Sequence, residues 1–468
     1  MTEFKRSLGL LDAVMLVSGS MIGSGIFIVT ASMTRELGSA GWLMVAWLVA
    51  GLLTVMAALS YGELSGMMPK AGGQYVYIQR AFGPLMAFLY GWTVFTVIQT
   101  GVIAAVAMAF AKFSAVFVPA FGPDNILLDI GFLKINAAQV LAISSIVLLT
   151  WFNSRGVKDG KTLQTLFTLA KILALMTLIV LGIYVGSKNG ILLQNFQNLW
   201  TASKLTILDG VESISPLTGM ALLSALGVAM VGSLFSSDAW NNVTFIAGEI
   251  REPQRNIPLS LFFGTFIVTT LYVLANVAYL ALLPMYNIQT AVEDRVGTAA
   301  AHVIFGDASA YVMAALIMIS TFGCNNGIIL AGGRLFYAMS KDGLFFKQGA
   351  ILNRNSVPGF ALWAQGVWAC VLCLSGRYGD LLNYTTFASL LFYIITIGGL
   401  FVLRRKEPNA ERPYKAFGYP LIPAIYILAA SAFCLNLVVM EPVYTGAGLL
   451  IVSLGLPVYF WQRSRVGA

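Results

Sequence analysis

Two short segments rich in glycine and polar residues interrupt long apolar runs of this 468-residue chain. The first is Gly23-Ser24-Gly25, and the second runs from Phe235 to Asn241. Lipid offers no water to backbone amides and carbonyls, so unwound backbone at membrane depth persists only where it is buried in protein or lines a cavity. Paired interruptions, one in each half of a chain, indicate a secondary transporter with a binding site near the middle of the membrane.

The first interruption has the chemistry of a carboxylate site. A half-helix that begins near Ile26 carries partial positive charge at its N-terminus and leaves amide donors unpaired. The glycines on either side of Ser24 permit backbone angles that other residues avoid, which would leave these amides open. Close helix packing through small residues is the alternative, and the match with the second interruption favours a binding role.

The second interruption has the complementary chemistry, that of a site for an ammonium group. The first half of its helix ends near Phe235 and Ser236, where unpaired carbonyls suit an ammonium group. A carboxylate held by one interruption and an ammonium held by both describe an α-amino acid. Phe235 and Trp240 could close such a site against water. Ordinary core packing is the alternative, and for Phe235 we favour the gating role.

Two ionisable side chains lie at membrane depth, where charge is costly and usually functional. Lys171 follows Lys161 by about ten residues, or roughly 15 Å of helix, so we expect it to face the bundle interior. It could be a fixed cation, a proton carrier or part of a structural polar cluster. Asp238 could hold a cationic substrate, pair with a lysine or cap the second half-helix, and we favour capping because it needs no partner.

Enzymatic and ATP-driven functions find no support in the sequence. No carboxylate, cysteine or histidine cluster has metal-ligand spacing, and no phosphate-binding loop is present, so neither a metal nor a cofactor is expected. His302 is the one histidine, and we expect it in a loop, which argues against a histidine proton relay. We expect Glu249 to pair with a cation in a loop, and Arg334 to reach the membrane surface by snorkelling.

The elements that must position these residues are apolar segments of about 20 residues, each long enough to cross a bilayer. The chain is 58% hydrophobic and 10% charged, which is far too apolar for a soluble domain. These observations predict an all-α membrane protein with twelve transmembrane helices. We place them near residues 9–34, 41–66, 84–119, 135–153, 162–186, 217–247, 258–284, 309–338, 359–375, 380–403, 419–439 and 443–461.

The interruptions fall in helices 1 and 6, so the chain divides into two repeats of five helices. An odd number of helices per repeat requires the second repeat to be inverted, and inverted repeats support alternating access around a fixed site. Residues 1–403 would form this ten-helix transport core, with helices 1–5 at about 9–186 and helices 6–10 at about 217–403. Residues 404–468 would add the two trailing helices, 11 and 12.

The net charge of +8 is a topology signal and does not indicate a nucleic-acid partner. Basic residues concentrate in one set of alternating loops, which is the positive-inside pattern. This pattern predicts a multi-pass protein of the cell membrane with both termini in the cytoplasm. The expected partners are the lipid bilayer and amino acid substrates.

At these residues the chain resembles the amino acid–polyamine–organocation (APC) superfamily, and within it the L-type amino acid transporters and their bacterial homologues. The resemblance implies a LeuT-like five-plus-five fold with discontinuous helices 1 and 6, and sodium-independent exchange of amino acids. It is carried by Gly23-Ser24-Gly25-Ile26-Phe27, by Lys70-Ala71-Gly72-Gly73-Gln74-Tyr75, by the run from Phe235 to Asn241, by the run from Gly248 to Pro258, and by Arg412-Pro413.

The resemblance also implies a role for individual residues at the two interruptions. The carboxylate-binding amides would be those of Ser24, Gly25 and Ile26, and the amine-binding carbonyls those of Ile22, Phe235 and Ser236. Phe235 would be the outer gate. The helix 5 lysine of the family falls on Lys171, whose ammonium would take the space that sodium fills in sodium-coupled relatives.

Two departures from the family pattern bear on partners and substrates. Animal members of the heteromeric branch carry a cysteine between helices 3 and 4 for a disulfide to a glycoprotein. The stretch from Phe121 to Ile135 has none, so no disulfide-linked ancillary subunit is expected. Asp238 stands where several animal L-type members look glycine-like, and an acid there occurs in members for cationic and for small neutral substrates.

The leading prediction is therefore exchange of neutral amino acids. Proton- or sodium-coupled symport remains open, with Ser320 and Thr321 as possible hydroxyl ligands for sodium, and so does transport of cationic amino acids. From other classes, a membrane enzyme lacks a catalytic constellation, and a non-transporting sensor would bind an amino acid without moving it.

Overall fold

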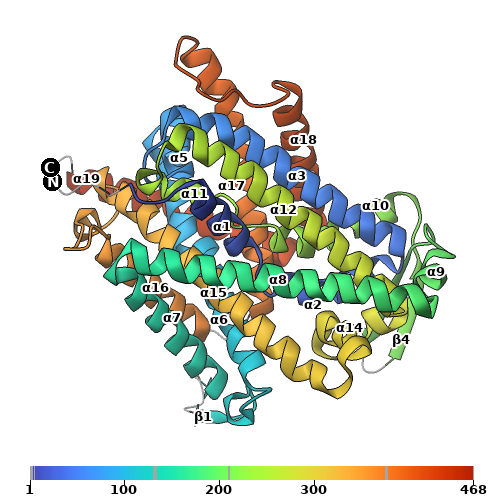
Figure 1. The fold of residues 1–468 in the computed structure, drawn as a ribbon. Coiled ribbons are helices and arrows are strands. Elements are labelled where there is room, and N and C mark those ends of the chain that lie inside the picture. The colour runs from blue at the N-terminus through green and yellow to red at the C-terminus, as the bar shows by residue number, and fades with distance from the viewer. Residues whose placement is uncertain (1–3, 5, 130–133, 209–210, 375–377, 467–468) are drawn as a thin grey trace.

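The computed structural model describes residues 4–466, apart from residue 5 and the segments 130–133, 209–210 and 375–377. Helices dominate this part of the chain, and the only strands found there are two short antiparallel hairpins in connecting segments. Figure 1 shows both termini on the same side of the helix bundle. The expectation of a mostly helical protein is confirmed.

The first half of the chain is built from the following helices. They are α1 (Leu10–Met21), α2 (Gly25–Leu37), α3 (Ala40–Met67), α4 (Gln74–Phe82), α5 (Pro84–Thr93), α6 (Gln99–Ser114), α7 (Ala137–Arg155) and α8 (Val157–Asn189). A π-helical turn, Val94–Ile98, joins α5 and α6 into one span. The hairpin of β1 (Ile126–Asp129) and β2 (Lys134–Asn136) lies between α6 and α7.

The second half begins after a connection that contains α9 (Ile191–Phe196) and the hairpin of β3 (Ser203–Leu208) and β4 (Val211–Pro216). Its long helices are α10 (Gly219–Ser236), α12 (Pro253–Leu282), α15 (Ser309–Lys341), α16 (Gly359–Leu374), α17 (Tyr378–Lys406), α18 (Leu421–Met440) and α19 (Pro442–Val466). Shorter helices connect them: α11 (Asn242–Phe245), α13 (Met285–Gln289) and α14 (Val296–Phe305).

Ten helices of the described chain are long and apolar enough to cross a membrane, and the bent pair α1–α2 makes an eleventh. The helix α16 lies where the ninth segment was predicted, but it is a shorter apolar helix. The count of twelve, the inverted repeat and the boundary of the core at residue 403 therefore stay predictions.

Local sequence explains where the first helices begin and end. Gly38 terminates α2 in the left-handed region, at a φ of 53°, as glycine commonly does. The Ser39 hydroxyl then accepts a hydrogen bond from the Trp42 amide at the start of α3. Asn136 and Gln139 form a reciprocal capping box that starts α7.

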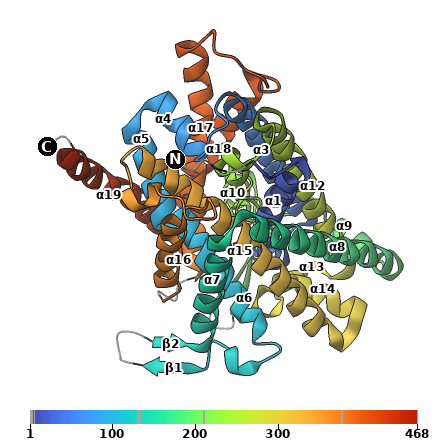
Figure 2. The ribbon, with the colours of Figure 1, turned by 60° about the vertical axis from the view of Figure 1, so that its left-hand side comes forward.

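The helices of the two halves are interleaved. Helix α3 packs along α12, α6 along α15, and α10 along α2. Helix α1 lies among α8, α12 and α15, inside the bundle (Figures 1 and 2). This arrangement surrounds both interruptions with protein, which is the condition for unwound backbone at membrane depth.

Candidate functional site

The first interruption is three residues long and bends its span by 42°. The Ile22 amide still bonds to the Ser18 carbonyl, and the new helix begins with the Phe27 amide on the Ser24 carbonyl. Within the described chain, no backbone carbonyl accepts from the amides of Ser24, Gly25 or Ile26. These are the three donors that the family resemblance implied for a carboxylate.

Gly25 is required here because of space rather than backbone angle. Neither glycine of the interruption has a positive φ, so the expectation of unusual angles was wrong. A Cβ on Gly25 would lie 2.3 Å from the Ser236 Oγ and 3.3 Å from the Ser236 Cα. The two interruptions therefore touch each other at Gly25 and Ser236.

The second interruption is longer and strained. Helix α10 ends at Ser236, and the Asp238 amide donates to the Phe235 carbonyl at 3.1 Å. Ala239 then adopts a φ of 66°, which a residue with a side chain rarely does. Strain of this kind is typical of functional segments that the surrounding structure holds in place.

Tyr272 joins the two interruptions, which was not predicted from the sequence. Its hydroxyl oxygen lies 2.9 Å from the Met21 carbonyl oxygen and 3.1 Å from that of Ser236. The ring is fully buried on α12. A tyrosine within an apolar helix resembles ordinary core packing, and the chain has 18 tyrosines, so only the fold distinguishes this one.

Lys171 faces the interior, as predicted, and bonds only to backbone carbonyls among the described groups. Its ammonium nitrogen lies 2.5 Å from the Gly19 oxygen, 2.7 Å from the Ile22 oxygen and 3.3 Å from the Ser320 oxygen. The Ser320 hydroxyl also lies close, 3.1 Å from the Ile22 oxygen. The Thr321 hydroxyl bonds instead to Ile317 of its own helix.

The three carbonyls expected to hold a substrate amine already have partners inside the protein. The Ile22 oxygen accepts from Lys171 and Ser320. The Phe235 oxygen accepts one amide, and the Ser236 oxygen accepts the Tyr272 hydroxyl. Because a carbonyl oxygen has two lone pairs, the last two can each accept one further hydrogen bond.

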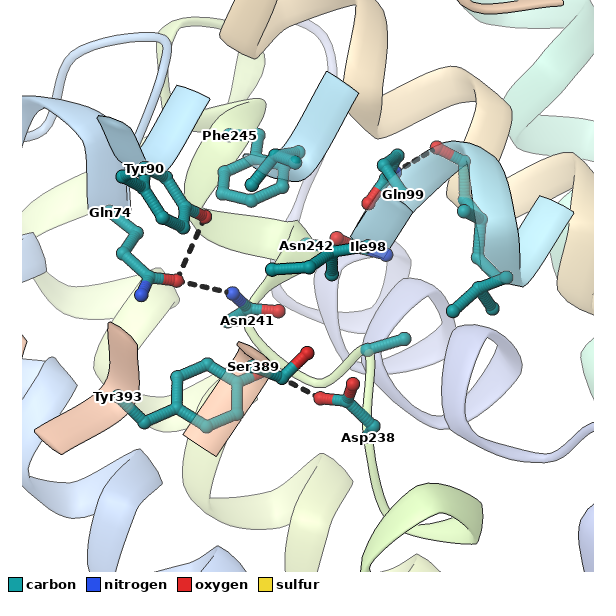
Figure 3. Close-up of a pocket in the computed structure, with 14 residues that line it drawn as sticks. Gln74, Tyr90, Ile98, Gln99, Asp238, Asn241, Asn242, Phe245, Ser389 and Tyr393 are labelled. Carbon is teal, nitrogen blue, oxygen red and sulfur yellow. Dashed lines mark hydrogen bonds between the residues drawn. The ribbon is translucent and has the colours of Figure 1, made fainter. Parts of the chain in front are cut away.

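Asp238 lies between two small cavities and accepts a hydrogen bond from the Tyr393 hydroxyl (Figure 3). It does not cap the second half-helix. Helix α11 begins after Asn241, and no side chain makes a capping bond there. No described lysine or arginine forms an ion pair with Asp238. The preferred interpretation from sequence, capping, was therefore wrong.

The first cavity beside Asp238 contains a polar network organised around Gln74, at the start of α4. The Gln74 side-chain oxygen accepts from the Tyr90 hydroxyl at 2.9 Å and from the Asn241 side-chain amide at 2.8 Å (Figure 3). Its amide nitrogen donates to the Thr396 hydroxyl. The neighbouring Asn242 side-chain nitrogen is buried without a hydrogen-bond partner in the described protein.

Phe235 and Trp240 have different surroundings. Phe235 is half-buried and lines a hollow of about 710 Å³ between α2, α10 and β3. Trp240 is buried, with its ring 4.8 Å from the Tyr61 ring and 5.1 Å from the Tyr393 ring. Trp240 is thus part of the aromatic core, and Phe235 is the one of the two that borders open space.

A buried ion pair lies beyond the second interruption. The Arg334 Nε donates to the Glu249 Oε1 at 2.9 Å, and both side chains are almost completely buried. Snorkelling was therefore the wrong explanation for Arg334, and the partner of Glu249 lies on α15 rather than in a loop. The Glu249 carbonyl also accepts the amides of Ser7 and Leu8.

Comparison with known proteins agrees with these observations. The model of the amino acid permease family matches residues 8–458. The chain belongs to this family. The permease is therefore a multi-pass member of the APC superfamily of amino acid transporters and not an enzyme, as the resemblance implied.

Two relatives show how far this similarity extends. The chain is 31% identical to the mouse b(0,+)-type amino acid transporter 1, over 98% of this chain and 88% of that protein. It is also 31% identical to the human large neutral amino acids transporter small subunit 2, over 98% of this chain and 81% of that protein. Both matches extend over nearly all of the permease.

Proposed function

We propose that the chain exchanges neutral amino acids across the cell membrane by alternating access, without sodium. The observation that carries this proposal is the position of Lys171. Its ammonium lies against carbonyls from α1 and α15, as a bound cation would. Backbone carbonyls suit an alkali cation, and a permanent ammonium there would exclude sodium by charge and by volume.

The substrate backbone would bind between the two interruptions. The free amides of Ser24, Gly25 and Ile26 supply donors for the carboxylate at the positive end of α2. The carbonyls of Phe235 and Ser236 can each accept one further bond from the ammonium, and Ile22 lies beside them. We therefore propose that the substrate backbone is bound by the residues named in this paragraph, from Ile22 to Ile26 without Gly23 and at Phe235 and Ser236.

The substrate side chain would point toward Asp238 and the cavities beside it. These have volumes of about 30 and 20 Å³, enough for roughly one or two water molecules each. Small neutral side chains fit this space with little rearrangement. The Asp238 carboxylate already accepts from Tyr393, which favours a neutral substrate over a cationic one.

Phe235 would act as the outer gate, and the hollow that it borders would lead to the cell exterior. This orientation follows from cytoplasmic termini, which the basic loops predict. The hollow is lined by residues 29–36 of α2, residues 228–235 of α10 and β3. No disulfide-linked subunit would be needed, since residues 121–135 contain no cysteine.

Counterflow into proteoliposomes tests the proposal. We expect uptake of labelled alanine only when the vesicles contain an amino acid, with the same rate after sodium is replaced by choline. Uptake into empty vesicles driven by a sodium gradient would contradict exchange. A panel of labelled amino acids, including lysine, would identify the substrates.

Proton-coupled symport is the second candidate, because one observation favours it. Lys171 is buried, and no described carboxylate pairs with it, so its charge is compensated only by dipoles. Such an amine could release and rebind a proton during the cycle. Uptake into empty vesicles that depends on an imposed pH gradient, and not on internal amino acid, would favour this mechanism.

A further inference from the structure

We propose that the chain binds an anionic phospholipid in a groove between α3, α12 and the loop that joins α17 to α18. The groove has a volume of about 950 Å³. Its walls combine an apolar floor with two cations, Arg255 and Lys415. This proposal rests on the membrane setting of the family and is independent of the exchange mechanism.

The floor has the character of a site for acyl chains. Leu59 comes from α3, Leu259 and Phe262 come from α12, and Phe417 comes from the loop. Phe417 is 66% exposed, although it lies next to an apolar helix pair. Burying such a side chain against hydrocarbon removes apolar surface from water, which is favourable.

The two cations suit a phosphate headgroup. Arg255 is 74% exposed, and its ion pair with Glu252, at 3.7 Å on an exposed surface, contributes little. Lys415 is exposed and makes no ion pair with any described residue. No carboxylate is among the described residues that line the groove. Positive charge above an apolar floor selects an amphiphile with an anionic head.

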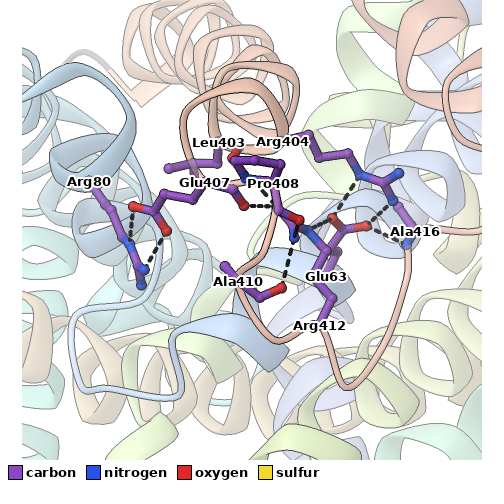
Figure 4. A network of polar contacts seen from close by, with 9 residues as sticks. All are labelled: Glu63, Arg80, Leu403, Arg404, Glu407, Pro408, Ala410, Arg412 and Ala416. Atoms are coloured by element: carbon purple, nitrogen blue, oxygen red, sulfur yellow. Dashed lines mark hydrogen bonds and ion pairs between the residues drawn. The ribbon is translucent and has the colours of Figure 1, made fainter.

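The loop wall of the groove is fixed in place from behind. Glu63 is buried on α3 and binds Arg404 and Arg412, and its Oε2 accepts the Ala416 amide at 2.7 Å (Figure 4). These bonds fix the residues on both sides of Lys415. A site whose walls are held before binding loses less entropy when the ligand arrives.

The ring of Tyr414 completes this wall. It packs against Gly62 so closely that a Cβ there would lie 2.7 Å from the Tyr414 Cε1. Helix α12 begins at Pro253, so Arg255 lies in its first turn, at the expected boundary between headgroups and hydrocarbon. If the termini are cytoplasmic, this boundary belongs to the leaflet that carries anionic lipid.

The test measures lipid binding to the purified full-length chain by native mass spectrometry. Dioleoyl-phosphatidylglycerol is the anionic probe, and dioleoyl-phosphatidylcholine is the zwitterionic one. The double variant Arg255→Gln with Lys415→Gln should bind phosphatidylglycerol roughly 30-fold more weakly, with about fivefold lost for each basic residue. Its weak binding of phosphatidylcholine should not change.

Two further variants separate charge from packing. Lys347→Gln with Arg354→Gln removes two exposed charges outside the groove and should retain wild-type binding. Phe417→Ser should weaken the binding of both phosphatidylglycerol and phosphatidylcholine. If the double variant unfolds, Arg255→Lys with Lys415→Arg keeps the charge and should bind normally, and loss of binding there would contradict the proposal.

Equal phosphatidylglycerol binding by wild type and the glutamine double variant would overturn the proposal. The proposal would also be overturned if the control variant, Lys347→Gln with Arg354→Gln, lost as much phosphatidylglycerol binding as the groove variant. Inorganic phosphate at millimolar concentration should not displace the lipid. Displacement by phosphate would identify the groove as a site for free anions and would also overturn it.

Discussion

Two buried cations occupy very different surroundings in this protein. Lys171 meets carbonyl oxygens of α1 and α15, and no described carboxylate is bonded to it. Arg334, farther along α15, is paired with the carboxylate of Glu249. The charge of Arg334, beyond the second interruption, is thus neutralised by a carboxylate. The charge of Lys171, beside the first interruption, is not. A paired charge can hold two segments together, whereas an unpaired one remains available to respond to a ligand or a proton.

The largest effect is expected at the paired cation, in stability. Arg334→Ala would leave Glu249 buried without its partner and should lower the free energy of unfolding by about 3–5 kcal/mol. Unfolding in detergent measures this loss. The variant Arg334→Gln with Glu249→Gln should recover part of it, and equal stability of Arg334→Ala and wild type would show that the pair holds nothing together.

The next effect is expected at Lys171, in transport. Lys171→Ala removes the donor from the carbonyls of Gly19, Ile22 and Ser320, and should slow counterflow by about 10- to 100-fold, since bonds to charged groups contribute about 1.5–3 kcal/mol. Lys188→Ala, at the exposed end of the same helix, is the control and should transport normally. Wild-type rate and affinity on both faces would disprove a role for Lys171.

A smaller effect is expected at Tyr272, which joins the two interruptions. Tyr272→Phe removes one hydroxyl, worth about 1 kcal/mol, and should slow counterflow by about fivefold. Tyr279→Phe is a matched control on the same helix, because its buried hydroxyl has no hydrogen-bond partner in the described protein. If both variants slow counterflow equally, the hydrogen bonds of Tyr272 do not explain the loss of transport.

Asp238→Asn should change transport by less than about threefold, since the amide oxygen can still accept from Tyr393 and only the charge assistance is lost. The preference for alanine over lysine, measured in counterflow, should stay the same. A marked loss of lysine binding in this variant would instead favour a cationic substrate.

The smallest effect is expected in the pH dependence of stability, at the exposed ion pair of Arg80 and Glu407. Arg80 hydrogen-bonds to Glu407 and lowers the pKa of that carboxyl below its usual value. Stability from this pair is therefore present above the unfolded-state pKa of Glu407 and is lost as the pH falls through the lower folded-state value. Thermal unfolding of Arg80→Gln should show less acid destabilisation than wild type, and identical pH profiles would contradict this.

The sequence located the two interruptions and the depth of Lys171, because apolar runs and their breaks are properties of consecutive residues. It could not pair residues across helices. The contacts of Tyr272 with two carbonyls and of Asp238 with Tyr393 depend on how helices are rotated against one another. The space around Gly25 likewise depends on Ser236, which lies more than two hundred residues away in the sequence.

The same limit explains the error at Arg334. Position along a helix suggested that its side chain could reach the surface, but the direction it faces was set by helix packing. Expectations that rested on depth were therefore more reliable than those that needed a partner. Gln74 also needed the fold, because its partners Tyr90 and Asn241 lie on other elements.

The contact of Leu8 with Ile250 has a practical consequence for experiments. The amides of Ser7 and Leu8 donate to Glu249, and the Arg251 amide returns a bond to Leu8. If the proposed alternating access opens this end of the molecule, all of these bonds must break. A fluorescent protein or affinity tag fused before residue 7 would therefore act directly on this contact, whereas the same label after α19 would be joined to a segment that takes no part in it.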